Sequence, residues 1–135
     1  MKWVKQSIHY WCPDTKEHKF LGQNVTVAIL DTGISPHPDF KGRILSFRDF
    51  SSTTGSSEKV LFSFSHFSPL IDNSGHGTHV AGILAGSGLL SSGTYAGIAP
   101  FCNLIIGKVL DQNGNGSIKN VINGIQWIRD IYTQF

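Results

Sequence analysis

Runs of apolar residues alternate along this chain with segments rich in glycine, serine and asparagine. Residues 25–30 (VTVAIL) are β-branched or aliphatic throughout and end at an Asp-Thr-Gly sequence. A short run that is apolar on both faces is typical of a strand inside a parallel sheet. Residues 43–50 (RILSFRDF) predict a weaker second strand, and residues 103–110 (NLIIGKVL) predict another buried one.

Two helices are predicted, one before and one after the last of these strands. Residues 76–85 (HGTHVAGILA) carry small side chains at spacings of three to five, which would let a helix pack closely on a sheet. The second helix follows the turn-rich residues 111–116, begins after the capping residue Ser117 and has apolar residues at the helical period. The small residues are Gly77, Ala81, Gly82 and Ala85, and the periodic ones are Ile118, Val121, Ile122, Ile125, Ile128 and Ile131.

The order strand, strand, helix, strand, helix predicts an α/β fold of three layers, with a mostly parallel sheet and flanking helices. Residues 1–21 are polar and aromatic without a clear period, and we expect them to lead into a domain at residues 22–135. Residues 51–70 are rich in Ser, Thr and Phe and predict an inserted loop. Its phenylalanines either line part of a cleft or, as we favour, pack on the domain; they are Phe62, Phe64 and Phe67.

Composition and charge exclude several classes of protein. The net charge of +2 comes from 11 basic and 9 acidic residues, without the clustered basic face that a nucleic-acid partner requires. No apolar run approaches the ~18 residues of a membrane-spanning helix. The N-terminal segment lacks the apolar core and cleavage site of a secretory signal, so we expect a cytoplasmic protein. Cys12 and Cys102 fit no metal or redox spacing, so we expect unpaired thiols.

The Asp31-Thr32-Gly33 sequence after the first strand admits three interpretations. Aspartate is a favoured turn residue after a strand. An Asp-Thr-Gly loop can also supply half of an aspartic-protease dyad, in which two carboxylates share a proton. Alternatively, the carboxylate belongs to a Ser-His-Asp triad, where it orients an imidazole. Asp31 lies at the carboxyl end of a predicted strand, which is the edge where open α/β sheets place their chemistry.

A second motif, residues 72–82 (DNSGHGTHVAG), places His76 at the start of a glycine-rich helix. A general base is best presented on a rigid element with its ring free toward the nucleophile. Gly75 and Gly77 would leave space there for a substrate backbone. His76 and His79 could instead ligate a metal, but no third ligand has a recognisable spacing. We therefore interpret His76 as the catalytic base and His79 as a buried histidine that supports the helix.

Four blocks of this sequence resemble consecutive blocks of the subtilisin-like serine proteases (subtilases, peptidase family S8), most like bacterial, intracellular-type members. The blocks are VAILDTGISPHPDF, DNSGHGTHVAGILAG, YAGIAP and GKVLDQNGNGS, and the resemblance runs from Gly22 to about Tyr132. The order Asp before His is that of subtilisin. The resemblance implies a subtilisin-like but truncated fold and serine endopeptidase activity on protein or peptide substrates. It implies no cofactor for the chemistry.

The resemblance also implies roles for individual residues. Asp31 would be the orienting carboxylate and His76 the general base and acid. Asp39 matches a position that often ligates a structural calcium ion in this family. Residues 113–116 match a strand-like segment that pairs with the substrate backbone, as an extended peptide does at an exposed edge. The substrate-binding residues would be Asn113, Gly114, Asn115 and Gly116.

The catalytic serine of the family lies in a Gly-Thr-Ser-Met-Ala-like block, and these 135 residues contain no such block. The asparagine that donates to the oxyanion would also lie beyond Phe135. We therefore expect the N-terminal half of a catalytic domain, as a fragment or an interrupted gene product. It would be inactive alone and would need a complementary C-terminal fragment that supplies the serine.

Two alternatives belong to other classes. One is a non-catalytic peptide-binding module derived from a subtilase. The other is a homodimeric aspartic protease, which we disfavour because the histidine motif and the helix at 117–132 have no place in it.

Overall fold

The computed structural model describes residues 2–10, 20–51, 58–60 and 71–134. Along them the helices are α1 (Lys2–Ser7), α2 (His76–Ala85) and α3 (Ile118–Ile131), and the strands are β1 (Thr26–Asp31), β2 (Ile44–Asp49), β3 (Glu58–Val60) and β4 (Asn103–Lys108). Short 3-10 turns occur at Pro38–Phe40, Leu89–Ser91 and Tyr132–Gln134. In this part of the chain no helix has the length and apolar character needed to cross a membrane.

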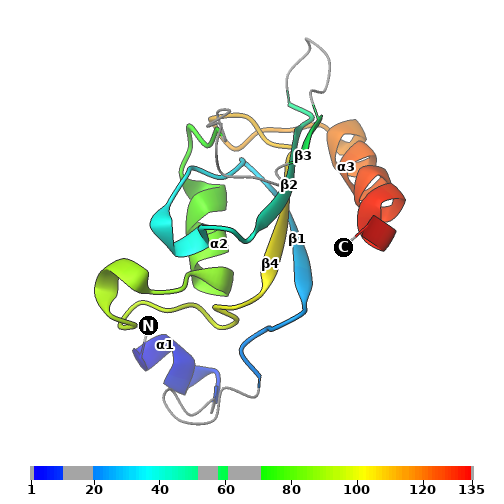
Figure 1. The fold of residues 1–135 in the computed structure, drawn as a ribbon. Coiled ribbons are helices and arrows are strands. Elements are labelled where there is room, and N and C mark those ends of the chain that lie inside the picture. The colour runs from blue at the N-terminus through cyan, green and yellow to red at the C-terminus, as the bar shows by residue number, and fades with distance from the viewer. Residues whose placement is uncertain (1, 11–19, 52–57, 61–70, 135) are drawn as a thin grey trace.

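A four-stranded sheet with the order β1-β4-β2-β3 forms the centre of the described structure. Strands β1, β4 and β2 run parallel, whereas β3 pairs antiparallel with β2. Helix α2 covers one face of the sheet and α3 covers the other (Figure 1). The predicted three-layer α/β fold with a mostly parallel sheet is therefore confirmed.

Two elements lie where the sequence predicts none. Helix α1 falls in the segment expected to lead into the domain without regular structure. Strand β3 falls in the predicted inserted loop and pairs with β2 in the register Ser46↔Val60. Both elements are too short for a periodic pattern to reveal them. The packing predicted for Phe62, Phe64 and Phe67 concerns residues outside the described ranges.

Strand β1 lies at an edge of the sheet, although its sequence predicts a central position. Among the described residues only β4 pairs with it, from Thr26↔Asn103 to Asp31↔Lys108. A strand that is apolar on both faces and open along one edge presents unpaired backbone groups and apolar side chains together. This edge is a surface on which a further strand could add.

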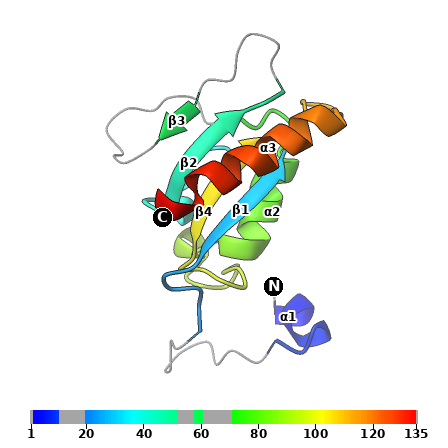
Figure 2. The same cartoon turned by 90° about the vertical axis from the view of Figure 1, so that its right-hand side faces the viewer.

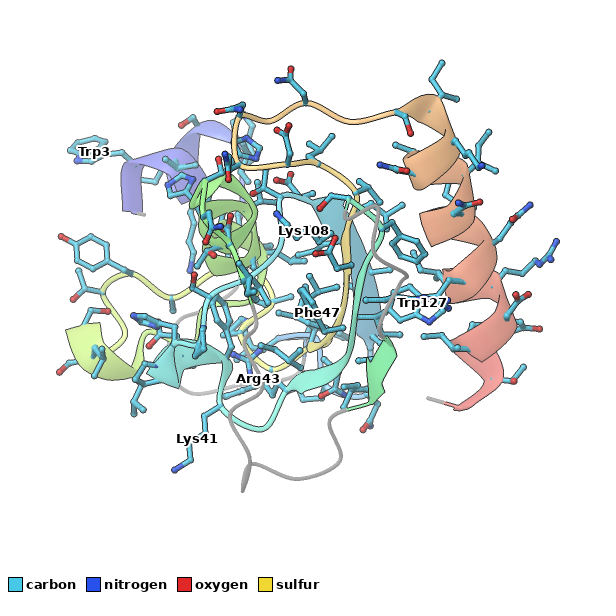
Figure 3. All side chains as sticks on the ribbon, turned by 90° about the horizontal axis from the view of Figure 1, so that it is seen from above. Trp3, Lys41, Arg43, Phe47, Lys108 and Trp127 are labelled. Carbon is cyan, nitrogen blue, oxygen red and sulfur yellow. The ribbon has the colours of Figure 1, made fainter. Side chains whose placement is uncertain are left out.

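The core has two parts because successive side chains of β4 point to opposite faces of the sheet. Leu104 and Ile106 belong to the larger cluster under α2, whereas Ile105 packs with Trp127 under α3. Figure 3 shows Phe47 and Trp127 on opposite sides of the sheet. The one cysteine that the structure describes, Cys102, is free and fully buried.

Helix α3 has two apolar faces, of which the sheet covers one. Ser117 caps the helix as predicted, since its Oγ accepts the N–H of Asn120 at 3.1 Å. The covered face includes Trp127 and Ile131. The apolar residues recur at the helical period as predicted, but three of these isoleucines lie on the uncovered face. The exposed apolar residues are Ile118, Ile122, Ile125 and Tyr132.

Arg43 ties the end of α2 to the sheet. Its guanidinium donates to the carbonyls of Cys102 at 2.8 Å and Ala85 at 2.6 Å, and also to that of Asp39. Burial lowers the pKa of Arg43, and a cation at this place also complements the C-terminal end of the helix. Lys41, two residues earlier, points away from the molecule (Figure 3).

The start of α2 touches the turn after β1 backbone to backbone. A Cβ atom at Gly77 would lie 2.3 Å from the carbonyl oxygen of Gly33. At Gly33, whose φ is +118°, a Cβ atom would lie 2.1 Å from the carbonyl oxygen of Ile71. The space predicted for a substrate at Gly77 is thus occupied by the protein itself. Of the two glycines beside His76, Gly75 is the one that faces open space, with no heavy atom within 4 Å of a Cβ position.

Two glycine substitutions in α2 should act in opposite directions. Gly77→Ala should lower the free energy of unfolding by about 1–3 kcal/mol, because the methyl group overpacks the contact with Gly33. Gly82→Ala is the matched control, since nothing lies within 4 Å of a Cβ atom there. It should raise the free energy of unfolding by about 0.5–1 kcal/mol through helix propensity. Urea unfolding followed by circular dichroism measures the free energy of unfolding of both variants. If both alanines stabilise the protein, the close contact with Gly33 does not require glycine at position 77.

Candidate active site

Asp31 and His76 meet at the carboxyl edge of the sheet. Asp31 is the last residue of β1, and His76 is the first residue of α2. Nδ1 of His76 lies 2.7 Å from Oδ1 of Asp31, although 45 positions separate them in the sequence. The two side chains therefore lie within hydrogen-bonding distance, as the orienting role expected of Asp31 requires, while their catalytic roles remain predictions.

The environment of the pair differs for its two members. The side chain of Asp31 is 13% exposed and that of His76 is 65% exposed. The hydrogen bond to Asp31, and then the charge of Asp31, raise the pKa of His76, with a smaller contribution from the charge of Asp72. Since folding raises this pKa, the pair stabilises the fold fully below the unfolded value of about 6.5, and the stabilisation is lost as the pH rises through the folded value. Nδ1 is occupied, so Nε2 is the ring nitrogen left to exchange a proton.

Thr32 holds the turn that carries Asp31. It is 1% exposed, and each of its hydrogen-bonding groups has a partner. Its N–H donates to Oδ1 of Asp31 at 2.7 Å. Its hydroxyl donates to Oδ1 of Asp72 at 2.8 Å and accepts the N–H of Gly77 at 2.9 Å. Its carbonyl accepts from Nζ of Lys108 at 2.5 Å.

Lys108 brings a buried cation to the carboxyl edge of the sheet (Figure 3). It ends β4, stands in register with Asp31, and donates to the carbonyls of Thr32 and Leu110. No role was predicted for Lys108 from the sequence. The sequence does contain a signal for such a role: a single lysine interrupts the apolar run LIIGKVL, and a lysine buried there requires hydrogen-bond acceptors for its ammonium group.

Asp72 is the second residue beside the pair for which no role was predicted. Its Oδ1 accepts the hydroxyl of Thr32 and the N–H of Gly75, the latter at 2.9 Å. Its Oδ2 accepts the N–H of Thr78 at 2.8 Å and the hydroxyl of Thr78 at 2.5 Å. Burial opposes ionisation of this carboxyl, but the hydrogen bonds from Thr78, Thr32 and Gly75 more than offset it and lower the pKa of Asp72 to about 2. A role for Asp72 could have been predicted from its position, because an aspartate shortly before a predicted helix start often accepts N–H groups of that helix.

His79 is exposed, so the prediction that it is buried is wrong. Helix α2 buries the stripe made by Gly77, Ala81 and Ala85. Position 79 lies about 200° around the helix from position 77 and so faces away from the sheet. The metal alternative for His76 and His79 gains no support, since the described ranges contain no group of three or more His, Cys, Asp or Glu residues that could hold a metal ion.

The predicted substrate-binding residues 113–116 are exposed but closed into a turn, so the predicted extended conformation is wrong. Oδ1 of Asp111 accepts the N–H groups of Asn113 at 2.8 Å and Asn115 at 2.9 Å. The Asp111 N–H in turn donates to the Asn115 carbonyl at 2.7 Å. Aspartate often folds a loop onto its own backbone in this way. Gly116 follows the turn and packs on the backbone of Val109, whose N–H donates to the Asp31 carbonyl.

Asp39 holds the loop after α2 through hydrogen bonds. Its Oδ2 accepts the N–H of Gly88 at 2.9 Å, and its Oδ1 accepts that of Leu90 at 3.5 Å and lies 3.8 Å from Nδ1 of His37. A calcium ion takes roughly six to eight oxygen ligands. Two of the groups around this carboxylate are backbone N–H donors, which cannot ligate a cation, and the third is a nitrogen atom, Nδ1 of His37, which accepts the Asp39 N–H. The residues present at Asp39 therefore do not fit the calcium site that the resemblance implies.

Comparisons with known proteins show what this chain is similar to. A sequence model described as the Subtilase family matches residues 22–133. Serine protease AprX of Bacillus subtilis (strain 168) is 47% identical over 106 residues, which cover 78% of this chain and 21% of AprX. The major intracellular serine protease of the same strain is 41% identical over 108 residues, which cover 78% of this chain and 30% of that protein.

Solved structures of similar proteins share the fold. Sphericase superposes with a TM-score of 0.72 at 30% identity, covering 90% of this chain and 36% of sphericase. A cold-adapted subtilisin-like serine proteinase gives a TM-score of 0.60 at 31% identity, covering 84% and 35% of the two chains. The chain thus spans between 21% and 36% of the length of these relatives. On the family match, the relatives and the shared fold together, this chain belongs to the subtilase family of subtilisin-like serine proteases.

Proposed function

We propose that these residues supply the acid and the base of a serine endopeptidase site. The observation that carries the proposal is the 2.7 Å contact between Asp31 and His76 at the carboxyl edge of the sheet. A triad needs a carboxylate that fixes the imidazole through Nδ1 and leaves Nε2 toward the nucleophile. Membership of the subtilase family supports the same assignment.

In the proposed mechanism, His76 takes a proton from a serine hydroxyl as that oxygen attacks a peptide carbonyl, and then gives the proton to the leaving amine. Asp31 stabilises the imidazolium that exists between these steps, which agrees with the raised pKa of His76. The partly buried position of Asp31 strengthens that interaction, because the local dielectric constant is lower than in water.

We propose further that the nucleophile and the oxyanion donors come from outside these 135 residues. The sequence contains no Gly-Thr-Ser-Met-Ala-like block. Among the described residues, the ring of His76 makes its hydrogen bond with Asp31. An acid and a base without a positioned nucleophile have only water to activate, and water is not held in place as a side chain is.

A complementary C-terminal segment of a subtilase domain is the partner that we propose. Two surfaces support it: the open edge of β1 and the exposed apolar face of α3, which carries Ile118, Ile122 and Ile125. Helix α3 crosses the same sheet that β1 borders (Figure 2). A segment that adds a strand beside β1 and packs an apolar face on α3 would bury both surfaces.

The peptide-binding module remains the alternative function, with residues 113–116 as its docking edge. An added peptide strand needs free backbone groups along an extended segment. The turn closed by Asp111 engages the N–H groups of Asn113, Gly114 and Asn115 internally. This observation favours the catalytic half-site over the docking module.

The isolated chain should not hydrolyse a fluorogenic peptide above the rate in buffer. Mixing it with a C-terminal subtilase fragment that carries the serine block should restore turnover. His76→Ala should then lower the restored rate by about 100- to 10,000-fold, the usual contribution of a general base. His79→Ala, an exposed position on the same helix, is the matched control and should leave the rate unchanged.

Two outcomes would contradict this proposal. Turnover by the isolated chain that disappears in His76→Ala would place a nucleophile within these residues. A mixture that forms a complex but shows no turnover in the presence of His76 would refute the assignment of the base.

Calcium should not stabilise this chain through Asp39. A chelator should leave the melting temperature unchanged, whereas Asp39→Ala should lower the free energy of unfolding by about 1–3 kcal/mol, because the Gly88 and Leu90 N–H groups lose a charged acceptor. Differential scanning calorimetry with and without added calcium measures both. A calcium-dependent rise in melting temperature that vanishes in Asp39→Ala would show that Asp39 is a ligand after all.

A further inference from the structure

Two crossed hydrogen-bond chains end on the carboxylate of Asp72. In the first chain, the N–H of Gly77 donates to the hydroxyl of Thr32, which donates to Oδ1 of Asp72. In the second, the N–H of Ser35 donates at 2.9 Å to the hydroxyl of Thr78, which donates to Oδ2 of Asp72. Each chain thus passes between the turn after β1 and the first turn of α2.

The two threonine hydroxyls have fixed roles in these chains. Each accepts a backbone N–H, so its own proton is directed to Asp72. The carboxylate can accept both protons because, when ionised, it is an acceptor on both oxygens. It also accepts the N–H groups of Gly75 and Thr78, so four donors converge on one side chain.

The residues held by Asp72 are the neighbours of the Asp31–His76 pair. Thr32 directly follows Asp31 and donates its N–H to the Asp31 carboxylate. Gly75 directly precedes His76, and Thr78 lies two positions after it. We propose that Asp72 is a positioning residue, which sets the distance between Asp31 and His76 by holding the segments on both sides of the pair. This inference rests on the proposed function of the pair, but its test needs no activity.

An ordinary capping role does not account for these contacts. The N-cap of α2 is Gly75, and a capping aspartate would satisfy only N–H groups of its own helix. Asp72 also receives the hydroxyl of Thr32, which lies on another segment, 40 positions earlier in the sequence. Asparagine could not replace it, because the amide presents one acceptor oxygen and one NH₂ donor to four donors.

The ring of His76 reports on this arrangement, and its pKa can be measured by NMR titration of the chain itself. The charged groups that act on the ring are Asp31 and Asp72. Asp72→Asn should lower the pKa of His76, both because the hydrogen bond to Asp31 loosens and because a nearby charge is lost. Thr78→Val separates these causes, since it breaks one chain without any change of charge. It should also lower the pKa of His76, by a smaller amount.

Asp39→Asn is the matched control. It removes the charge of another carboxylate that accepts backbone N–H groups, beyond the far end of α2. The pKa of His76 should not change in this variant. If the pKa of His76 shifts in Asp72→Asn but not in Thr78→Val, Asp72 acts on His76 only through its charge, and the proposal is overturned.

An unchanged His76 pKa in both folded variants would overturn the proposal as well. If Asp72→Asn does not fold, Thr78→Val decides the question alone. Failure of the reconstituted enzyme to turn over would refute the proposed function without affecting this titration, so the two failures can be told apart.

Discussion

The backbone contact between the turn after β1 and the first turn of α2 determines where the groups at the sheet edge lie. Gly33 and Gly77 approach more closely than any Cβ atom would allow, and the hydroxyl of Thr32 accepts the N–H of Gly77 across the same contact. Asp31 directly precedes Thr32, and His76 directly precedes Gly77. Because the following residues touch, the two side chains extend from adjoining points of the backbone and meet.

A buried lysine on one side and a partly exposed aspartate on the other stabilise this contact. Lys108 donates to the carbonyl of Thr32 at the end of the sheet, and Asp72 accepts the hydroxyl of Thr32 from the side of α2. A polar network in which every member has a partner is rigid, and a rigid support is what an orienting carboxylate requires. These contacts all lie within the described residues, so this part of the chain itself arranges the Asp31–His76 pair.

The sequence predicts the parts of this structure that depend on local pattern. The strand before Asp31, the helix from His76 to Ala85 and the cap at Ser117 follow from periodicity and turn chemistry. Periodicity cannot say which face of a helix a neighbour covers, so it does not separate the outer isoleucines of α3 from the inner ones, and His79 was wrongly predicted to be buried. The roles of Asp72, Asp111 and Asp39 depend on where distant N–H and hydroxyl groups lie, and no spacing in the sequence encodes that.

Native-state hydrogen exchange at the amide of Gly77 measures whether the contact between the turn after β1 and the first turn of α2 opens only with the whole fold. This N–H is buried and donates to the hydroxyl of Thr32. If the contact is part of the cooperative fold, the amide should exchange with the same opening free energy as the buried amides of Ile105 and Ile106 in β4. If the Gly77 amide instead exchanges as fast as exposed turn amides while β4 stays protected, α2 opens independently of the sheet. The contact with the turn after β1 would then not determine where Asp31 and His76 lie.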